Sequence, residues 1–314
     1  MTEDKDYEAI IIGGGPGGLT AAIYACRYKL KTLVIAKSFG GEIVQAPHVE
    51  NYPGFKMISG MELMDKFKDQ AGSFGAEFLE KEVISIKKVD DGYNVVVEGD
   101  ETYHADAVLM AIGSNRRILG VKGEKEFSGR GVSYCATCDA PFFRDKTVAV
   151  IGGGNSAILS VLLLSEYAKK VYLIYRKGKD KIRAEPYRVE IVENNPKCEF
   201  IFDTNLTEIY GDSVVKGIKT DKGKTMDIDG VFIEIGFDPN TKMLKELGSE
   251  VDDEGYIKVE KDQSTCCPGM FAAGDFTTGT NKFKQALCAS AEGAVAAEAM
   301  FDYIKKKKME KKRK

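Results

Sequence analysis

The sequence predicts an α/β fold in two domains of similar design, and three observations lead to this prediction. The segment YEAIIIGGGPGGLTAAIYACRYKLKTLVIAKS, which starts at Tyr7, reads as a strand, a glycine turn, a helix and a second strand. The segment KTVAVIGGGNSAILSVLLLSEYAKKVYLIYRK, which starts at Lys146, repeats this construction. A chain of 314 residues, 43% of them apolar, is long enough for about two domains.

The first glycine turn has the Gly-x-Gly-x-x-Gly pattern of a dinucleotide-binding site. It follows the apolar run at 9–12 and opens a helix whose apolar side chains recur at helical spacing. The first glycine allows a tight turn, the second lets a pyrophosphate approach the backbone, and the third lets helix and strand pack closely. The helix N-terminus then holds the anion. The candidate residues are Gly13, Gly15, Pro16, Gly17 and Gly18.

The second glycine turn has the related pattern Gly-x-Gly-x-x-Ala. Two dinucleotide sites in one chain predict electron transfer between two bound dinucleotides, typically from nicotinamide to flavin. Arg176 and Lys177 follow the next strand and suit the 2′-phosphate of NADP, or else they only solvate the strand end. The corresponding stretch of the first unit, 35–37, has no carboxylate to bind a ribose. The candidate residues in the second turn are Gly152, Gly154, Asn155 and Ser156.

Charge and hydropathy exclude several classes of function. The net charge is -3, although residues 305–314 hold eight Lys or Arg and one Glu. We expect this basic tail to be a solvated, frayed terminus, because it lacks the aromatic residues or amphipathic pattern of a nucleic-acid or membrane segment. The start is acidic rather than basic, and the longest apolar stretch, AILSVLLL, is too short to span a membrane. We therefore expect a cytoplasmic protein with no nucleic-acid or membrane partner.

The stretch SYCATCDAPF places Cys135 and Cys138 two residues apart in the middle of the chain. In a reducing compartment such a pair is either a redox disulfide or half of a metal site. A zinc site needs a second pair, and the only candidates, Cys266 and Cys267, are adjacent and too cramped. We therefore expect no metal. The remaining cysteines are expected to be small buried apolar side chains: Cys26, Cys198 and Cys288.

Over nearly its whole length, apart from the tail, the chain resembles the low-molecular-weight thioredoxin reductases. The segments that carry the resemblance are GGGPGGLTAAIYACR, GGEIVQAPHVENYPGF at 40–55, AIG at 111–113, GRGVSYCATCD at 129–139, VIGGGNSA, EIGFDPNT at 234–241 and PGMFAAGDFTTGTNKFKQALCASAEG. The resemblance implies two Rossmann-like domains of the three-layer β/β/α type, the second inserted into the first. It assigns 1–116 and 244–314 to an FAD-binding domain, and 117–243 to a pyridine-nucleotide and redox-disulfide domain.

The resemblance also assigns roles to single residues. It implies that Cys138 faces the flavin, that Cys135 attacks the partner disulfide, and that Asp139 is the acid and base. Electrons would pass from NADPH to tightly bound FAD, then to this disulfide, then to thioredoxin, in a homodimer. Besides the first glycine turn, the FAD residues carried over are Ala36, Lys37, Gly40, Gly41, Glu42, Ile43, Asn51, Ala111, Gly113, Gly274, Asp275, Lys284, Gln285 and Ala286.

The pyridine-nucleotide half departs from the family pattern. The usual His-Arg-Arg-x-x-x-Arg segment reads YRKGKDKIRA here, with Tyr175 for His, Lys177 for Arg, and Arg183 two residues late. The helix that follows the second glycine turn also lacks the acidic residues that the family often carries there. NADPH remains the expected donor, and NADH, reduced ferredoxin or a deazaflavin are alternatives. An alternative of another class is a non-catalytic flavin-binding redox sensor or interaction module.

Overall fold

The computed structural model describes residues 5–46 and 49–313 and divides the chain into two units. The first unit contains the chain up to Asn115 and again from Asp238, and the second is Arg116–Phe237. The sequence placed the second boundary six residues later, at 243/244. In the structure residues 238–243 belong to the first unit, because Asn240 donates a hydrogen bond to Ile112 O and Met243 packs on the core of that unit.

The first unit is built on a seven-stranded sheet in the order β3-β2-β1-β6-β5-β4, with β17 also paired to β6. The pairs among β3, β2, β1, β6 and β17 are parallel, whereas β5 and β4 continue the sheet antiparallel to β6. The strands are β1 Asp6–Gly14, β2 Thr32–Phe39, β3 Glu77–Glu80, β4 Val83–Val89, β5 Gly92–Val97, β6 Thr102–Met110 and β17 Met270–Ala272.

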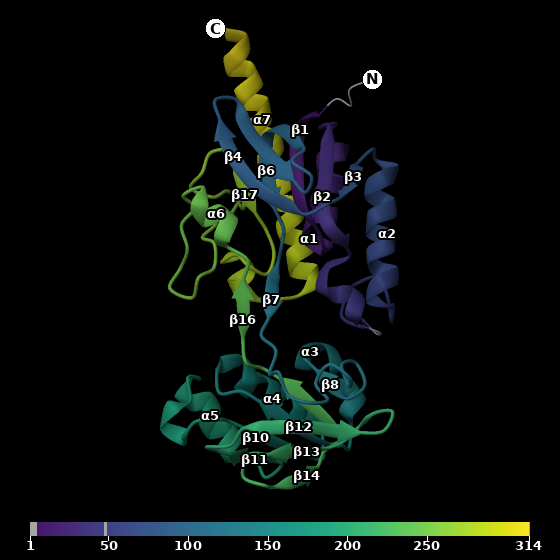
Figure 1. The fold of residues 1–314 in the computed structure, drawn as a ribbon, viewed down its shortest axis with the longest axis vertical. Coiled ribbons are helices and arrows are strands. Elements are labelled where there is room, and N and C mark those ends of the chain that lie inside the picture. Colours follow the sequence, from purple (N-terminus) through teal and green to yellow (C-terminus); the bar gives the residue numbers. More distant parts are fainter. Residues whose placement is uncertain (1–4, 47–48, 314) are drawn as a thin grey trace. The chain divides into compact units, whose positions relative to one another are not determined.

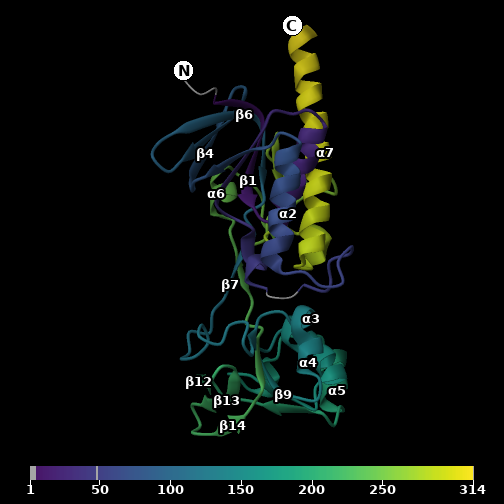
Figure 2. The ribbon, with the colours of Figure 1, turned by 90° about the vertical axis from the view of Figure 1, so that its right-hand side faces the viewer.

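Alternate side chains of β1 enter two different cores. Ala9 and Ile11 pack against the helices, whereas Ile10 and Ile12 pack against the side chains of β4 and β5. Figure 2 shows α2 and α7 on one side of the central strands and β4 on the other. The expected β/β/α layering is therefore correct for this unit. Its helices are α1 Pro16–Arg27, α2 Gly60–Ser73, α6 Lys242–Glu246 and α7 Ala286–Arg313, with short helices η1 Gly41–Gln45 and η4 Gly279–Lys282.

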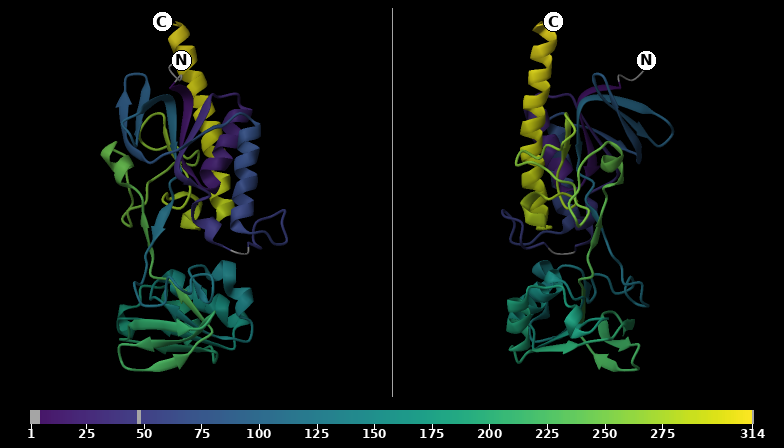
Figure 3. Two further views of the ribbon diagram at one scale, coloured as in Figure 1. Left: turned by 45° about the vertical axis from the view of Figure 1, so that its right-hand side comes forward. Right: turned by 90° about the vertical axis from the view of Figure 1, so that its left-hand side faces the viewer.

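The basic tail is the last part of α7, a continuous helix that reaches Arg313 (Figure 3). Lys307 pairs with Asp106 at 2.6 Å and with Asp91 at 3.0 Å, and only 17% of its side chain is exposed. Lys308 pairs with Glu8. The expectation of a frayed terminus is wrong for these residues, because acidic side chains from distant parts of the first unit lie along this helix.

The second unit has a parallel five-stranded sheet in the order β11-β10-β9-β15-β8 and a separate antiparallel sheet β12-β13-β14. Its strands are β8 Val132–Ser133, β9 Thr147–Ile151, β10 Lys170–Ile174, β11 Cys198–Ile201, β12 Leu206–Gly211, β13 Val215–Thr220, β14 Thr225–Asp227 and β15 Gly230–Ile233. Its helices are α3 Ala136–Asp139, α4 Asn155–Tyr167 and α5 Pro186–Glu193, with short helices η2 Ala140–Phe143 and η3 Lys179–Lys181.

The second unit repeats the design of the first. Val148 and Val150 of β9 pack against α4, whereas Ala149 and Ile151 face the antiparallel sheet. The order β11-β10-β9-β15 corresponds to β3-β2-β1-β6, so the duplicated sequence pattern produces a duplicated sheet. The chain leaves and re-enters the first unit through β7 Ser114–Arg116 and β16 Phe237–Pro239, which pair with each other (Figure 1). Among the described residues, no helix is long and apolar enough to cross a membrane.

Candidate dinucleotide sites and redox disulfide

The first glycine turn has three glycines with three different surroundings. Gly13 has φ +117°, and a Cβ there would lie 2.2 Å from the carbonyl oxygen of Ala111. A Cβ on Gly18 would lie 1.9 Å from the carbonyl oxygen of Gly13, so the third glycine permits the close packing of α1 on β1. Gly15, by contrast, has φ -84°, and its nearest neighbour would be Gly41 Cα at 3.8 Å. Of the three glycines of the pattern, only Gly15 therefore has open space where a ligand could approach the backbone.

The helix that begins at this turn offers its first N–H groups to a ligand. Gly15 is the N-cap of α1, and no side chain among the described residues caps that end. Uncapped N–H groups at the start of a helix bind anions. The turn at Gly40 and Gly41, with φ values of +108° and +66°, lies beside it, since a Cβ on Gly41 would be 3.2 Å from Gly15 Cα.

The predicted residues in and just after β2 take different positions. Ala36 is buried, and a Cβ on Gly14 would lie 3.1 Å from its methyl group, so Ala36 lines the turn from behind. Lys37 is exposed, and its ammonium pairs with Glu82 at 2.8 Å. Glu42 and Ile43 lie in η1, which contacts the start of α2, because a Cβ on Gly60 would be 1.7 Å from Ile43 O. The Lys37 ammonium is thus engaged by a carboxylate of the protein.

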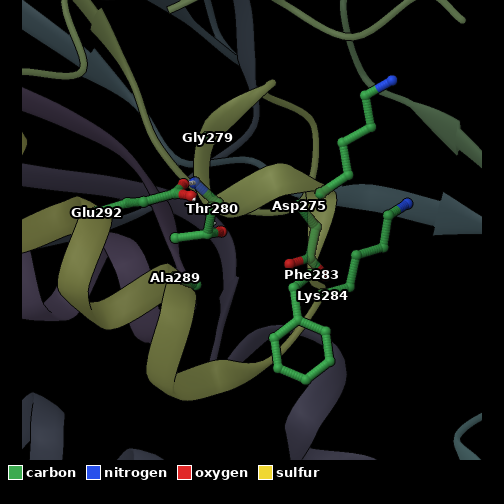
Figure 4. Close-up of a pocket in the computed structure, with 9 residues that line it drawn as sticks. Asp275, Gly279, Thr280, Phe283, Lys284, Ala289 and Glu292 are labelled. Atoms are coloured by element: carbon green, nitrogen blue, oxygen red, sulfur yellow. Dashed lines mark hydrogen bonds between the residues drawn. The ribbon is translucent and has the colours of Figure 1, made fainter. Parts of the chain in front are cut away.

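Residues from distant parts of the chain meet near the start of α7. Asn51 donates a hydrogen bond to the side chain of Gln285 at 3.0 Å, and Lys284 donates one to Ser114 at 3.2 Å. A small pocket lies beside them (Figure 4). Its lining residues are Gly274, Asp275, Gly279, Thr280, Lys282, Phe283, Lys284, Ala289 and Glu292. The structure therefore brings together the predicted residues of 274–286 and Asn51, which are more than 200 positions apart in sequence.

Glu292 organises this pocket, and no local sequence pattern marks it as a site residue. Its carboxylate accepts hydrogen bonds from the backbone N–H of Gly274 at 2.5 Å and from the Thr280 hydroxyl at 2.6 Å. Only 3% of the residue is exposed, and burial raises the pKa of its carboxyl group. Figure 4 shows Glu292 reaching from α7 toward Thr280. In sequence it resembles any acidic residue of a helix surface, so only its partners reveal its role.

The second glycine turn repeats the closest contact of the first. A Cβ on Gly152 would lie 2.3 Å from the carbonyl oxygen of Glu234, as Gly13 would meet Ala111. Ala157, the third residue of the pattern, is fully buried. Gly154 has no atom within 4 Å of its Cβ position, and no described side chain caps the start of α4. The second turn is therefore open to a ligand at the same place as the first.

Of the three predicted cations of the second unit, Arg183 lies beside the second turn. Arg183 forms a parallel β-bridge with Gly154, and its N–H donates to Gly153 O at 2.8 Å. Arg176, Lys177 and Arg183 are exposed, and within the described ranges none of them forms an ion pair. Arg183 lies two residues further along the chain than the last arginine of the family pattern, but its β-bridge with Gly154 places it beside the turn.

Tyr175, which replaces the family's histidine, supports the loop that carries Arg183. Its ring lies against Gly153, where a Cβ would be 2.4 Å away, and its hydroxyl donates to Lys181 O at 2.9 Å. Asn155 adds a second tie, because its side-chain oxygen accepts from the N–H of Glu185 at 3.0 Å. The loop is thus held by β10 on one side and by the start of α4 on the other. Ser156 is exposed in the first turn of α4.

Cys135 and Cys138 form a disulfide at the start of α3, with their Cα atoms 5.3 Å apart. Cys135 is the N-cap of this helix, and its sulfur accepts the N–H of Cys138 at 3.2 Å. An N–H donor favours the thiolate form of a sulfur over the thiol. The geometry therefore supports a thiolate at Cys135 after the bond is broken.

Asp139 is linked to this disulfide through Ser133. The Ser133 hydroxyl donates to Asp139 Oδ2 at 2.6 Å and accepts the N–H of Cys135 at 3.1 Å. Ser133 is 5% exposed and lies in β8, so the sheet holds it in place. The sequence pointed to Asp139 and missed Ser133, because a serine two residues before a CxxC pair is not distinctive by itself.

Glu234 is a second acid beside the disulfide helix. It follows the end of β15, is half-buried, and accepts hydrogen bonds from the Ser160 hydroxyl at 2.7 Å and from the backbone N–H of Ala136. Burial raises the pKa of Glu234 to about 7. The AILSVLLLS stretch of α4 has no acidic residue, and the structure brings Glu234 to that stretch from the end of the neighbouring strand.

The other cysteines differ in exposure, and Cys288 lies beside Thr280 of the pocket. Cys26 is buried, as expected, whereas Cys198 and Cys288 are only half-buried. Burial raises the pKa of all three thiols, which makes them poor nucleophiles. Cys266 is exposed, and Cys267 donates a hydrogen bond to Leu247 O at 3.2 Å. The described residues contain no group of three or more His, Cys, Asp or Glu side chains that could hold a metal ion.

Comparison with known proteins places the chain in a family. Residues 7–293 match the pyridine nucleotide-disulphide oxidoreductase family. A thioredoxin reductase of Listeria innocua is 41% identical over 98% of this chain and 97% of its own, and one of Mycolicibacterium smegmatis is 42% identical over 94% and 96%. A Mycobacterium leprae protein named bifunctional thioredoxin reductase/thioredoxin is 40% identical over 93% of this chain and 64% of its own.

A solved structure gives the same result. The crystal structure of thioredoxin reductase from Streptococcus pyogenes covers 97% of this chain and 100% of its own, with a TM-score of 0.89 at 36% identity. The fold class and the family predicted from the glycine turns and the CATCD stretch are therefore correct. The chain belongs to the thioredoxin reductases, oxidoreductases of the pyridine nucleotide-disulphide family that act on a disulfide.

Proposed function

We propose that this protein carries electrons from NADPH, through FAD, to the Cys135–Cys138 disulfide and then to thioredoxin. The observation that carries the proposal is the repeated glycine turn, open at Gly15 in one unit and at Gly154 in the other. The second of these turns shares its unit with a cysteine pair that is already joined as a disulfide. One chain thus offers two dinucleotide sites and a dithiol couple.

The residues of the first unit fit FAD. The space at Gly15 and the uncapped start of α1 suit a pyrophosphate, and the pocket at Gly274 and Asp275 adds polar groups near Lys284. When bound, FAD would supply two-electron transfer between a nicotinamide and a disulfide. The protein's own contribution is to bind and orient it, with Glu292 fixing the backbone of the 274–280 loop.

The second unit suits NADPH better than NADH. Among the described residues, Arg176, Lys177 and Arg183 have no carboxylate partner, so their charge is available to a 2′-phosphate. Lys177 offers a point charge where arginine would offer a planar fork. Arg183, which lies beside Gly154, can make up for that difference because it is an arginine close to the turn. These cations support NADPH over NADH, because the 2′-phosphate is the group that distinguishes the two nucleotides.

The cysteine pair and Asp139 would handle the disulfide chemistry. After reduction, the Cys135 thiolate attacks the disulfide of thioredoxin and one thioredoxin sulfur leaves; Cys138 then attacks Cys135, re-forms the internal disulfide and releases the second thioredoxin sulfur. Asp139 holds the proton for the leaving sulfur, and Ser133 orients it through the 2.6 Å hydrogen bond. The name of the Mycobacterium leprae relative, which joins both activities, supports thioredoxin as the partner.

The donor is tested anaerobically with the purified, FAD-loaded protein. We expect NADPH to bleach the flavin band rapidly and NADH to do so slowly. Bleaching by dithionite but by neither nucleotide would contradict NADPH as the donor and leave reduced ferredoxin or a deazaflavin as the donor.

We also propose that the protein is a homodimer in the cytoplasm, as the resemblance implies. Light scattering on the FAD-loaded protein tests the dimer.

The role of the disulfide is tested with two cysteine variants. Cys138→Ser should keep FAD and its bleaching by NADPH but lose turnover with thioredoxin. Cys266→Ser is the matched control, because this exposed cysteine lies outside the sites described, and it should retain full turnover. Thioredoxin reduction by Cys138→Ser at the normal rate would remove the pair from the reaction.

A further inference from the structure

The buried acid Glu234 has no role in the function proposed so far. Its backbone matches that of Ala111 in the first unit, since both carbonyl oxygens lie against the first glycine of a turn. The side chains differ: the first unit has a methyl group and the second has a carboxyl group. A buried carboxyl group is costly to ionise, so its presence at one of two equivalent places calls for a function.

The surroundings of Glu234 connect it to the redox helix. The N–H that it accepts belongs to Ala136, the residue directly after Cys135. From α4 it accepts a hydrogen bond from the Ser160 hydroxyl, and the positive charge of Arg116 in β7 favours its ionised form. Besides Cys138, α3 carries Asp139, which accepts a hydrogen bond from the Ser133 hydroxyl. A thiolate formed at Cys135 would therefore lie one residue from the N–H that donates to the Glu234 carboxylate.

We propose that Glu234 takes up a proton when the Cys135–Cys138 disulfide is reduced, so that the new thiolate is balanced by neutralising this carboxylate. This inference rests on the redox role proposed for the disulfide. In the step, two electrons from the reductant break the S–S bond. One proton goes to Cys138, Cys135 remains a thiolate, and a second proton goes from solvent to Glu234. The couple therefore gains two electrons and two protons in total.

Electrostatics gives the direction of the effect. In the disulfide form the pKa of Glu234 is about 7, so its two forms are both populated near neutral pH. A thiolate nearby in a poorly solvated site raises the pKa of a carboxyl group, because two like charges repel. Reduction thus shifts Glu234 to the neutral form, and oxidation releases the proton. Without this exchange, the Cys135 thiolate and the Glu234 carboxylate would both be charged on either side of the Ala136 N–H.

The test is infrared difference spectroscopy of the FAD-loaded protein at pH 7.5, reduced with dithiothreitol against oxidised. We expect reduction to produce a protonated-carboxyl band and to remove a carboxylate band. Both changes should be absent in Glu234→Gln, which keeps the size of the side chain and an acceptor oxygen. They should persist in Asp139→Asn, which assigns them to one acid rather than the other. In Ser160→Ala the bands should remain but shift in frequency.

A second readout is the number of protons taken up per two electrons, read from the pH dependence of the disulfide's midpoint potential. It should be close to two in the wild type at pH 7.5 and fall toward one in Glu234→Gln. If thiol titration shows that the disulfide is reduced but the wild-type spectra show no carboxyl change, the role of Glu234 is overturned and the redox role of the disulfide stands. A disulfide that dithiothreitol cannot reduce would instead contradict the redox role proposed above.

Discussion

Adding one methyl group at the second glycine of each turn should separate the two dinucleotide sites. In Gly15→Ala the new Cβ would lie 3.8 Å from its nearest neighbour, Gly41 Cα, and in Gly154→Ala it would meet nothing within 4 Å. Both residues have negative φ values that alanine adopts freely, -84° and -103°. Neither substitution strains the ligand-free fold, but each places a methyl group where the pyrophosphate should approach.

The expected magnitudes follow from these distances. Replacing an N-cap glycine by alanine costs roughly 1 kcal/mol or less of folding free energy. A methyl group forced into a closely packed contact costs about 1–3 kcal/mol, which is roughly a 5- to 150-fold loss of affinity. Gly15→Ala should therefore weaken FAD binding by that factor with little change in stability. Gly154→Ala should raise the KM for NADPH by a similar factor and leave FAD binding unchanged.

The assays are a fluorescence titration of the FAD-free protein with FAD and steady-state kinetics with varied NADPH. Gly18→Ala is the matched control, because its Cβ would lie 1.9 Å from Gly13 O and must disturb the fold itself. This control should lower the melting temperature, whereas the other two variants should melt within a few degrees of wild type. The reasoning is refuted if Gly15→Ala binds FAD normally, or if both variants weaken the same ligand.

Three further predictions test other parts of the structure. The pKa of Glu234, raised from 4.5 to about 7, makes folding less favourable as pH rises from about 4.5 to 7 and costs roughly 3 kcal/mol above that range. The melting temperature of Glu234→Gln should therefore exceed that of wild type by a margin that grows between pH 5 and 7.5; a constant margin would contradict the raised pKa. Arg183→Ala should raise the KM for NADPH about tenfold without affecting NADH, whereas Lys181→Ala, whose ammonium is paired with an aspartate, should change neither. Lys307→Ala should lower the free energy of unfolding by about 1–2 kcal/mol, because it leaves a largely buried carboxylate unpaired, while exposed Lys312→Ala should change it by less than about 0.5 kcal/mol, as denaturant melts can show.

Local patterns were enough to predict the family, the α/β fold and its duplication. A glycine turn between a strand and a helix, and a CxxC pair, are short motifs whose geometry depends on adjacent residues. Gly13, Gly18 and Gly152 accordingly lie in the close contacts that the pattern predicts. The two-sided alternation of β1 and β9 likewise follows from the period of a strand, which is a property of the backbone.

The tertiary structure decided which polar groups meet outside the local sequence motifs. Ser133 with Asp139, Glu292 with Gly274, and Glu234 with Ser160 are hydrogen-bonded pairs that no local pattern marks. The unit boundary at Phe237 and the packing of the basic end of α7 on acidic residues also depend on contacts that no local pattern marks. A buried polar group must find a partner wherever the fold brings one, so its identity depends on the packing of strands and helices and not on its neighbours in the chain.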